Sequence, residues 1–97
     1  MIGDRIRLLR DKANISQAEL ARKLSVTRSS VNAWESGLSA PTAAYLVELA
    51  RFFHVSTDYL LGLTDEHHLN LSGFTEGEVQ LLYNLTKYFD QNKEKQQ

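Results

Sequence analysis

Apolar residues recur every three or four positions along almost the whole chain, and no stretch shows the strict alternation of a half-buried strand. Near the start, this spacing connects Ile2, Ile6, Leu9 and Ala13. Side chains so spaced lie on one face of a helix, where they can be buried together. The pattern therefore predicts an all-α protein whose first helix covers residues 2–13.

Two short helices are predicted next, each with a suitable cap. Ser16 lies three positions before Glu19, the spacing of a capping box in which each side chain bonds the backbone of the other residue. A second helix is therefore expected over residues 17–24. Thr27 is suited to cap a third helix over residues 28–36, because its hydroxyl can accept from a free backbone N–H.

Two more helices complete the first part of the chain. Thr42 is placed to cap a fourth helix, whose apolar stripe runs to Phe53. Ser56 begins a short fifth helix that ends at Leu61, before a glycine. Five helices can close one core, so a compact domain is expected over residues 1–63.

The rest of the chain is predicted to be a linker and one amphipathic helix. Residues 64–73 are polar and are interpreted as the linker. Thr75 and Glu78 form another capping box at the start of segment 74–97, which holds the sixth helix. Residues 91–97 are charged and amide-rich and are expected to fray. The apolar positions of this helix are Val79, Leu81, Leu82, Leu85, Tyr88 and Phe89.

This sixth helix carries more apolar surface than an isolated tail needs. It can fold back onto its own domain or pair with a second copy of the chain. Pairing is favoured, because the linker separates the helix from five helices that already close a core. The predicted dimer interface consists of Val79, Leu82, Leu85, Tyr88 and Phe89.

Composition limits the possible classes of protein. The chain has 97 residues, 42% of them hydrophobic, which suits one domain with a modest core. The absence of cysteine excludes disulfides and cysteine-ligated metal sites, and it fits a reducing cytoplasm. The sequence has neither a signal-peptide pattern nor a bilayer-spanning run, so a soluble cytoplasmic protein without membrane contact is expected.

Neither a metal site nor a catalytic site is expected. His67 and His68 are adjacent, so their side chains diverge, and no third ligand lies near them in the sequence. No nucleophile–base pair, paired acids or phosphate-binding glycine loop is visible. We therefore expect a protein that is not an enzyme and needs no cofactor.

The net charge of −1 conceals an uneven distribution. Residues 1–36 hold seven basic and four acidic residues, a net charge of +3, whereas residues 64–97 hold three basic and six acidic residues, a net charge of −3. Attraction to phosphate depends on the local field, so the N-terminal third is the expected nucleic-acid face.

Segment 16–37 has the arrangement of a helix-turn-helix unit, two capped helices joined by a three-residue turn. Its second helix presents small polar side chains that fit the major groove of DNA. Arg28 can contact guanine through two hydrogen bonds, and Asn32 can do the same with adenine. The candidate base-reading residues are Gln17, Thr27, Arg28, Ser29 and Asn32.

Phosphate contacts are expected around these positions. Free N–H groups at the start of the second helix can bind an anion, and nearby basic side chains can neutralise the DNA backbone. Trp34 is interpreted chiefly as a core residue whose indole N–H can reach a phosphate, and Arg22 and Lys23 can equally serve solubility. The candidate phosphate contacts are Arg10, Ser16, Arg22, Lys23, Ser30, Trp34, Ser36 and Ser39.

A set of positions in the first 63 residues matches the pattern of one known family: Arg10, 17–21, Val31, Trp34, Glu35, Gly37, Pro41 and 55–62. On these positions, residues 1–63 resemble the Xre/Cro-C1 family of helix-turn-helix regulators, which includes the lambdoid phage repressors. The resemblance implies a five-helix, lambda-repressor-like DNA-binding domain in which the second helix braces the DNA backbone and the third reads bases. It also implies an ion pair between Arg10 and Glu35, and a C-terminal helix used for dimerisation or partner contact.

Two places depart from the family pattern. Ser25 occupies a turn position where relatives often have glycine, so backbone strain is expected there if the residue is left-handed. Residues 38–41 lack the basic side chains that some relatives carry after the third helix. Only neutral hydrogen bonds to DNA are therefore expected from Ser36 and Ser39.

The expected function is that of a transcriptional repressor that binds double-stranded DNA in a sequence-specific manner. One short reading helix contacts few base pairs, so we expect a homodimer on a pseudo-palindromic operator, with the helix over residues 28–36 in the major groove. The alternative is an antitoxin or another interaction module that holds a regulatory protein partner through residues 79–89 and also binds DNA.

Overall fold

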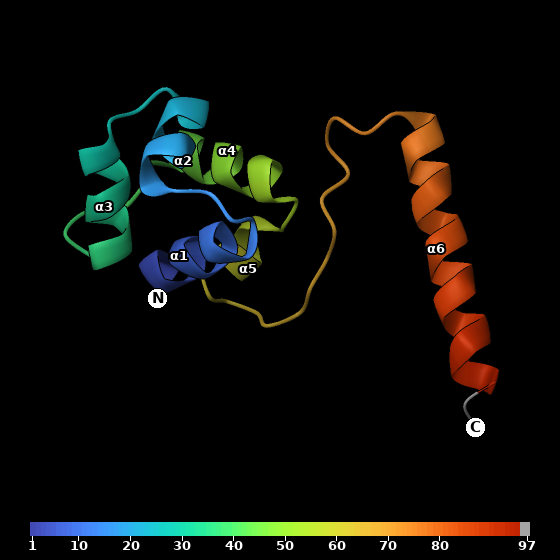
Figure 1. The fold of residues 1–97 in the computed structure, drawn as a ribbon. Helices are drawn as coiled ribbons and strands as arrows, with labels where there is room; N and C mark the ends of the chain where they lie inside the picture. The colour runs from blue at the N-terminus through green and yellow to red at the C-terminus, as the bar shows by residue number, and fades with distance from the viewer. Residues whose placement is uncertain (96–97) are drawn as a thin grey trace.

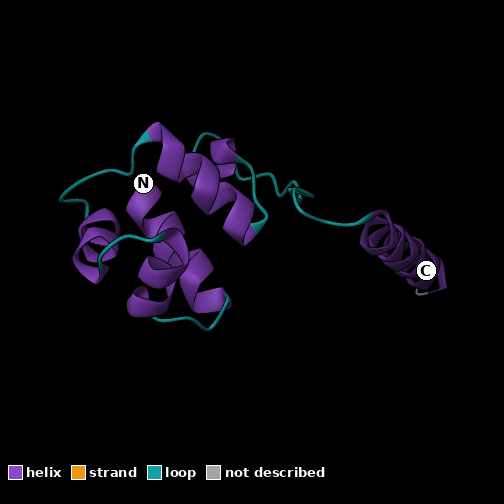
Figure 2. Cartoon of the chain, turned by 90° about the horizontal axis from the view of Figure 1, so that it is seen from above, coloured by secondary structure: helices purple, strands orange, loops and turns teal. Residues whose placement is uncertain are grey.

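The computed structural model describes residues 1–95, and this part of the chain contains helices and no strand. Helices α1 to α5 form one body, and α6 stands apart from it beyond an extended linker (Figure 1, Figure 2). The prediction of an all-α fold is therefore confirmed. In chain order the helices are α1 (Ile2–Lys12), α2 (Gln17–Leu24), α3 (Arg28–Ser36), α4 (Ala43–Phe53), α5 (Thr57–Leu60) and α6 (Glu76–Lys95).

The predicted bounds of α2 and α3 agree with the structure, and α5 ends at Leu60, one residue earlier than predicted. The larger difference is at the C-terminus, where α6 continues to Lys95. The expectation that the chain frays from residue 91 is therefore wrong for residues 91–95. Lysine, glutamate and glutamine are good helix formers, so a charged, amide-rich end can extend a helix that is already nucleated. Gln96 and Gln97 lie outside the described residues.

Helices α2 to α5 each begin at a hydroxyl that accepts a hydrogen bond from the backbone N–H three residues later. In α2 the cap is reciprocal, because the carboxylate of Glu19 also accepts from the Ser16 N–H at 3.0 Å. These caps fix the residue at which each helix starts. They are Ser16, Thr27, Thr42 and Ser56.

The core lies where the five short helices meet. Trp34 of α3 is 5% exposed, and the centroid of its ring lies 5.6 Å from that of Tyr45 in α4. Full burial of an aliphatic side chain contributes about 1.5–3 kcal/mol, so this cluster is a major stabilising contribution to the body. The fully buried side chains are Ile6, Leu20, Val31, Leu49 and Leu60.

Helices α1 and α3 approach each other closely at Gly3. A Cβ atom at this position would collide with the backbone carbonyl oxygens of Trp34 and Glu35. The missing side chain therefore lets α1 lie directly against the C-terminal half of α3, which keeps α3 in a defined orientation.

Helix α6 leaves its apolar side chains uncovered. Leu81 is 64% exposed, Leu85 49% and Phe89 53%. Of the two arrangements considered for this helix, the structure does not show the one in which it folds back onto its own body (Figure 1). Within residues 1–95, no helix combines the length and apolar character needed to cross a bilayer.

Candidate nucleic-acid interface

Helices α2 and α3 are joined by a tight turn that begins at Ser25. Ser25 is left-handed, with φ 58° and ψ 40°, and the next residue, Val26, donates its N–H to the Ala21 carbonyl at 2.9 Å. Ala21 is 3% exposed, so the two helices pack without a large side chain between them. The turn sends α3 to one end of the body, where one of its faces is open to solvent (Figure 1).

The open face of α3 carries the candidate base-reading side chains. Arg28, Ser29 and Asn32 are exposed and line one surface hollow of about 420 Å³ together with Ala33 and Leu38. An α-helix fits the major groove of B-DNA when its outward side chains are small or can extend along the base edges. The face formed by these residues meets that condition.

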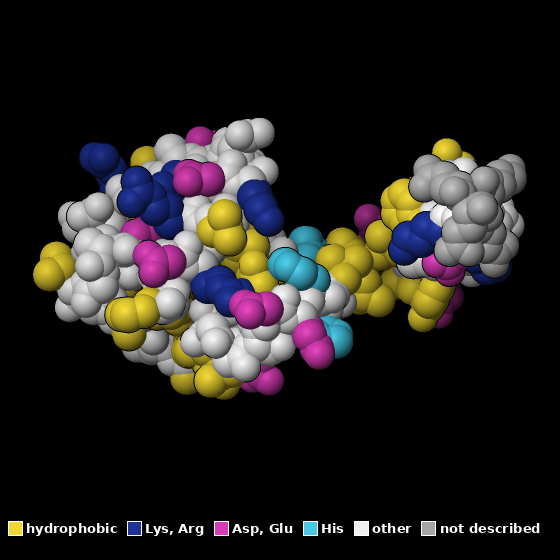
Figure 3. Space-filling model, turned by 90° about the horizontal axis from the view of Figure 1, so that it is seen from below, with side chains coloured by type: hydrophobic (Ala, Val, Ile, Leu, Met, Phe, Trp, Pro, Cys, Tyr) yellow, Lys and Arg dark blue, Asp and Glu magenta, His cyan; other side chains and the backbone are white. Residues whose placement is uncertain are grey.

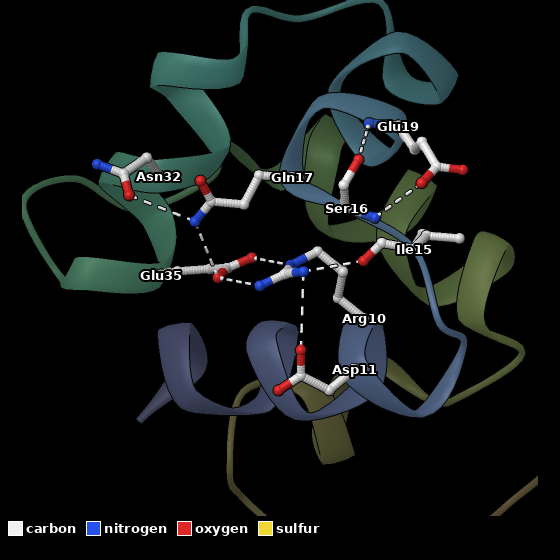
Figure 4. Close-up of polar contacts among 8 residues, drawn as sticks. All are labelled: Arg10, Asp11, Ile15, Ser16, Gln17, Glu19, Asn32 and Glu35. Carbon is white, nitrogen blue, oxygen red and sulfur yellow. Dashed lines mark hydrogen bonds and ion pairs between the residues drawn. The ribbon is translucent and has the colours of Figure 1, made fainter.

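Gln17 links the start of α2 to this face. Its side-chain nitrogen donates to Asn32 Oδ1 at 3.3 Å and to Glu35 Oε1 at 3.2 Å (Figure 4). The bond to Asn32 engages the amide oxygen and leaves the amide N–H groups to face outward. Gln17 is half-buried and does not itself lie on the open face of α3. Its contact with Asn32 instead orients the Asn32 side chain.

The ion pair implied by the family resemblance is present. Arg10 donates from Nε to Glu35 Oε2 at 2.7 Å and from Nη2 to Oε1 at 3.1 Å (Figure 4). Its Nη1 donates to the Ile15 carbonyl at 2.8 Å and lies 3.7 Å from Asp11. The hydrogen bonds that Arg10 donates to Glu35 raise the pKa of Arg10 despite partial burial. With its donors so engaged, Arg10 has little left to offer a phosphate.

The other phosphate candidates on α2 and α3 differ in availability. Arg22 and Lys23 are exposed on α2. The Ser16 hydroxyl accepts from the Glu19 N–H, and Ser30 Oγ lies 3.0 Å from Thr27 Oγ1. Both serines already serve a helix start, so a phosphate would meet them as second partners.

Three further candidates border a second hollow, between the start of α1 and the loop after α3. This hollow of about 430 Å³ is lined by Trp34, Ser36 and Ser39 among others. Among residues 1–93, whose side chains the structure describes, no buried side-chain nitrogen or oxygen lacks a hydrogen-bond partner. The indole N–H of Trp34 makes no hydrogen bond within this part of the chain, so it reaches the surface while the ring fills the core.

Leu38 is a candidate that the sequence analysis did not identify. It is 82% exposed and borders the same hollow as Arg28. Gly37 is left-handed, with φ 83°, and the Leu38 N–H donates to the Ala33 carbonyl at 2.9 Å, which holds Leu38 beside α3. An apolar side chain at this position can pack against the methyl group of thymine in the major groove. Its signal in the sequence is weak, because an apolar residue after a C-cap glycine usually packs on its own helix.

A comparison with protein families identifies this class of fold. A family model described as helix-turn-helix matches residues 6–60. The chain belongs to the Xre/Cro-C1-type helix-turn-helix family, whose members bind double-stranded DNA. The resemblance inferred from the sequence is thereby confirmed.

Individual relatives are transcriptional regulators of bacteria and phages. The HTH-type transcriptional regulator YobD of Bacillus subtilis is 39% identical over 66 residues, which cover 68% of this chain and 59% of the relative. ImmR of the same organism, also an HTH-type transcriptional regulator, is 36% identical over 63% of this chain and 48% of the relative. Repressor protein C2 of Salmonella phage P22 is 34% identical over 63% of this chain and 28% of the relative. The chain thus spans only part of the length of these relatives.

One solved structure is similar over nearly the whole chain. A chain of the complex between the SinR protein and the SinI protein aligns with 94% of this chain and 99% of its own length, with a TM-score of 0.59 and 24% identity. At this identity the similarity supports the all-helical fold and nothing further.

Proposed function

We propose that this protein is a transcriptional repressor that binds a pseudo-palindromic operator as a homodimer, with α3 in the major groove. One observation carries the proposal: Arg28, Ser29 and Asn32 share an exposed hollow on a helix whose opposite face is buried in the core. The similarity to regulators of bacteria and to a phage repressor supports a role in transcription.

The base contacts follow from the donors on α3. Arg28 offers the paired N–H groups that guanine accepts in the major groove. The side-chain oxygen of Asn32 already accepts from Gln17, so Asn32 offers its N–H groups to a base acceptor. To bind adenine through both its nitrogen and its oxygen, the Asn32 oxygen would accept a second hydrogen bond. Thr27 and Ser29 extend the contact at the start of the helix.

The phosphate contacts surround α3 on two sides. The start of α2 at Ser16 and the exposed Arg22 and Lys23 would bind one strand of the backbone. Trp34 and Ser39, at the second hollow, would bind the backbone on the other side. Such contacts fix the register of the reading helix without carrying sequence information.

The homodimer is proposed to form through α6. The apolar side chains of α6 are open to solvent: the exposed fractions are 49% for Leu85, 59% for Tyr88 and 53% for Phe89. Val79 and Leu82 are half-buried. Exposed apolar side chains repeated along one helix are an unfavourable surface in water, and a second copy of the same helix can cover them. The two α3 helices of the dimer then contact two half-sites, and the dimer distinguishes its operator from other DNA better than one helix does.

The test combines selection of bound duplexes from a random pool with sedimentation. The wild-type protein is expected to sediment as a dimer and to select two inverted half-sites. Leu82→Glu combined with Leu85→Glu is expected to give a monomer with weak operator binding, because two charges would have to be buried in the interface. The matched control carries Gln80→Glu and Gln91→Glu, which add the same charge at exposed polar positions of α6. A dimer in the Leu82/Leu85 variant would show that α6 is not the interface.

The apolar face of α6 also supports the alternative, an interaction module that holds a different protein. In that case the purified chain would be monomeric, and co-expression with the gene next to its own would give a stable heterodimer. A homodimer that binds an inverted repeat by itself would exclude this alternative as the main function.

A further inference from the structure

The linker, residues 64–73, lies against the α1–α5 body and is held most firmly at Asn70. The Asn70 N–H donates to the His54 carbonyl at 3.1 Å, and its side-chain nitrogen donates to the Val55 carbonyl at 3.3 Å. Its carbonyl oxygen lies 3.0 Å from Nδ1 of His54, and its side-chain oxygen accepts from the Ser72 N–H at 3.0 Å. Every polar group of this half-buried residue therefore has a partner.

The end of α4 creates the acceptor site for Asn70. His54 is the C-cap of α4 and is left-handed, with φ 57° and ψ 42°. Because the helix ends here, the carbonyls of His54 and Val55 have no partner from a further turn, and Asn70 supplies one for each. The ring of Phe74 stacks on the ring of His54, with centroids 4.6 Å apart. Phe74 directly precedes Thr75, the residue that caps α6.

The first half of the linker is held at a second place. The guanidinium of Arg5 pairs with Asp65, donates to the Thr64 carbonyl at 3.5 Å and lies 4.1 Å from the centroid of the Tyr59 ring. The His67 ring packs on the same tyrosine, with centroids 4.8 Å apart. The Asp65 carboxylate is 96% exposed, so this pair contributes little stability in water, and the Asn70 contacts are the stronger attachment.

The position of this attachment matters because α3 and α6 lie at opposite ends of the molecule (Figure 1, Figure 2). The linker alone connects the body to α6. Hydrophobic side chains cover part of the stretch between the body and that helix (Figure 3). In a dimer joined through α6, the point at which each linker leaves its body determines how far apart the two reading helices are held.

We infer that Asn70 is a positioning residue for DNA recognition: by fixing the linker to the end of α4, it sets the spacing between half-sites that the dimer accepts. The inference rests on the proposed homodimer. A free linker of this length would have a mean end-to-end distance of about 18 Å. At about 3.4 Å per base pair, such freedom corresponds to roughly five base pairs of uncertainty in half-site spacing. The attached linker removes most of that freedom, so the dimer accepts one spacing.

The test measures affinity for a series of duplexes in which two copies of the selected half-site are separated by spacers that differ by single base pairs. The variant is Asn70→Ala, and the matched control is Ser72→Ala, which keeps the backbone N–H through which Ser72 contacts Asn70. Wild type and control are expected to prefer one spacing by about tenfold or more over its neighbours. Asn70→Ala is expected to lose most of this preference. It should keep its affinity for a single half-site and its dimeric state, which a merely unfolded variant would lose.

A second variant keeps the test decisive if Asn70→Ala folds poorly. Phe74→Ala removes the ring stacked on His54 and leaves the polar contacts of Asn70, so a smaller loss of spacing preference is expected. Unchanged spacing preference in well-folded variants would overturn the inference. A wild-type dimer that accepts every spacing would also overturn it while leaving the proposed function intact. A monomeric wild type that binds one half-site as well as two would overturn both.

Discussion

The guanidinium of Arg10 in α1 and the carboxylate of Glu35 in α3 face each other in parallel, joined by hydrogen bonds of 2.7 and 3.1 Å. The two side chains are 13% and 5% exposed, so the pair is shielded from water and salt. Glu35 lies about one helical turn after Asn32 in α3. The ion pair that stabilises the body therefore also holds the helix that carries the open face.

Glu35→Ala is expected to lower the free energy of unfolding by about 3 kcal/mol, because it leaves the charge of Arg10 largely buried without its main partner. Urea denaturation of both proteins measures the difference. Glu48→Ala is the matched control, since Glu48 is an exposed glutamate on α4 and its loss should cost no more than about 0.5 kcal/mol. Equal effects of the two substitutions would mean that the ion pair contributes no more than a surface charge.

Arg28→Ala is expected to weaken operator binding by about 1–3 kcal/mol and to relax the preference at one base pair of each half-site. The comparison is with Arg22→Ala on α2, which should weaken binding to all sequences alike and reduce the dependence of affinity on salt concentration. Affinities for the operator, for single-base variants of it and for unrelated DNA, each at several salt concentrations, separate the two roles. A uniform loss on every sequence would instead make Arg28 a phosphate contact.

Ser25→Gly is expected to stabilise the protein by about 0.5–1 kcal/mol. A left-handed residue other than glycine costs roughly 1–2 kcal/mol, and the greater freedom of glycine in the unfolded chain offsets part of the gain. Ser25 has φ 58°, and Asn14 has φ 57° at the end of α1. Since asparagine tolerates this conformation better than serine, Asn14→Gly should give a smaller gain. Thermal unfolding decides, and a loss of stability in Ser25→Gly would show that the turn carries no such strain.

Much of the fold could be predicted because its signals are local. The capping box of Ser16 and Glu19, the hydroxyl of Thr27 and the glycine at 37 determine the ends of α2 and α3 within the sequence itself. The end of α6 had no such signal, since no glycine or proline follows residue 90. Composition alone suggested a frayed tail there, whereas the intrinsic helix preference of the same residues extends α6 to Lys95.

The candidate interface could be predicted only as far as helix periodicity determines which side chains point outward. Periodicity separates Arg28, Ser29 and Asn32 from the buried face of α3. The bond from Gln17 to Asn32 and the attachment of Asn70 to the end of α4 join residues 15 or 16 positions apart through the packing of whole helices. No local pattern contains that information, so such contacts become visible only in three dimensions.

The capping box of α2 should make stability depend on acid in a predictable direction. The hydrogen bond from the Ser16 N–H holds the pKa of Glu19 below its ordinary value, and the Ser16 side chain lowers this pKa by a smaller amount. A carboxyl whose pKa is lowered in the folded state stabilises the fold above its unfolded-state pKa, and this contribution is lost as the pH falls through the folded-state pKa. Glu19→Gln keeps a side chain that can accept the Ser16 hydrogen bond, but it cannot ionise.

Wild type is therefore expected to be more stable than Glu19→Gln at neutral pH, and this advantage should disappear as the pH falls through the folded-state pKa of Glu19, which lies below the ordinary value. Urea unfolding of both proteins, at neutral pH and at an acid pH where carboxyl groups are protonated, measures this difference. Glu48→Gln is the matched control, because Glu48 is an exposed glutamate on α4 outside any capping box, and substitution there removes a charge without removing a cap. If the stability difference between wild type and Glu19→Gln were the same at both pH values, the charge of Glu19 would contribute nothing to the cap, and its value would lie in hydrogen-bond geometry alone.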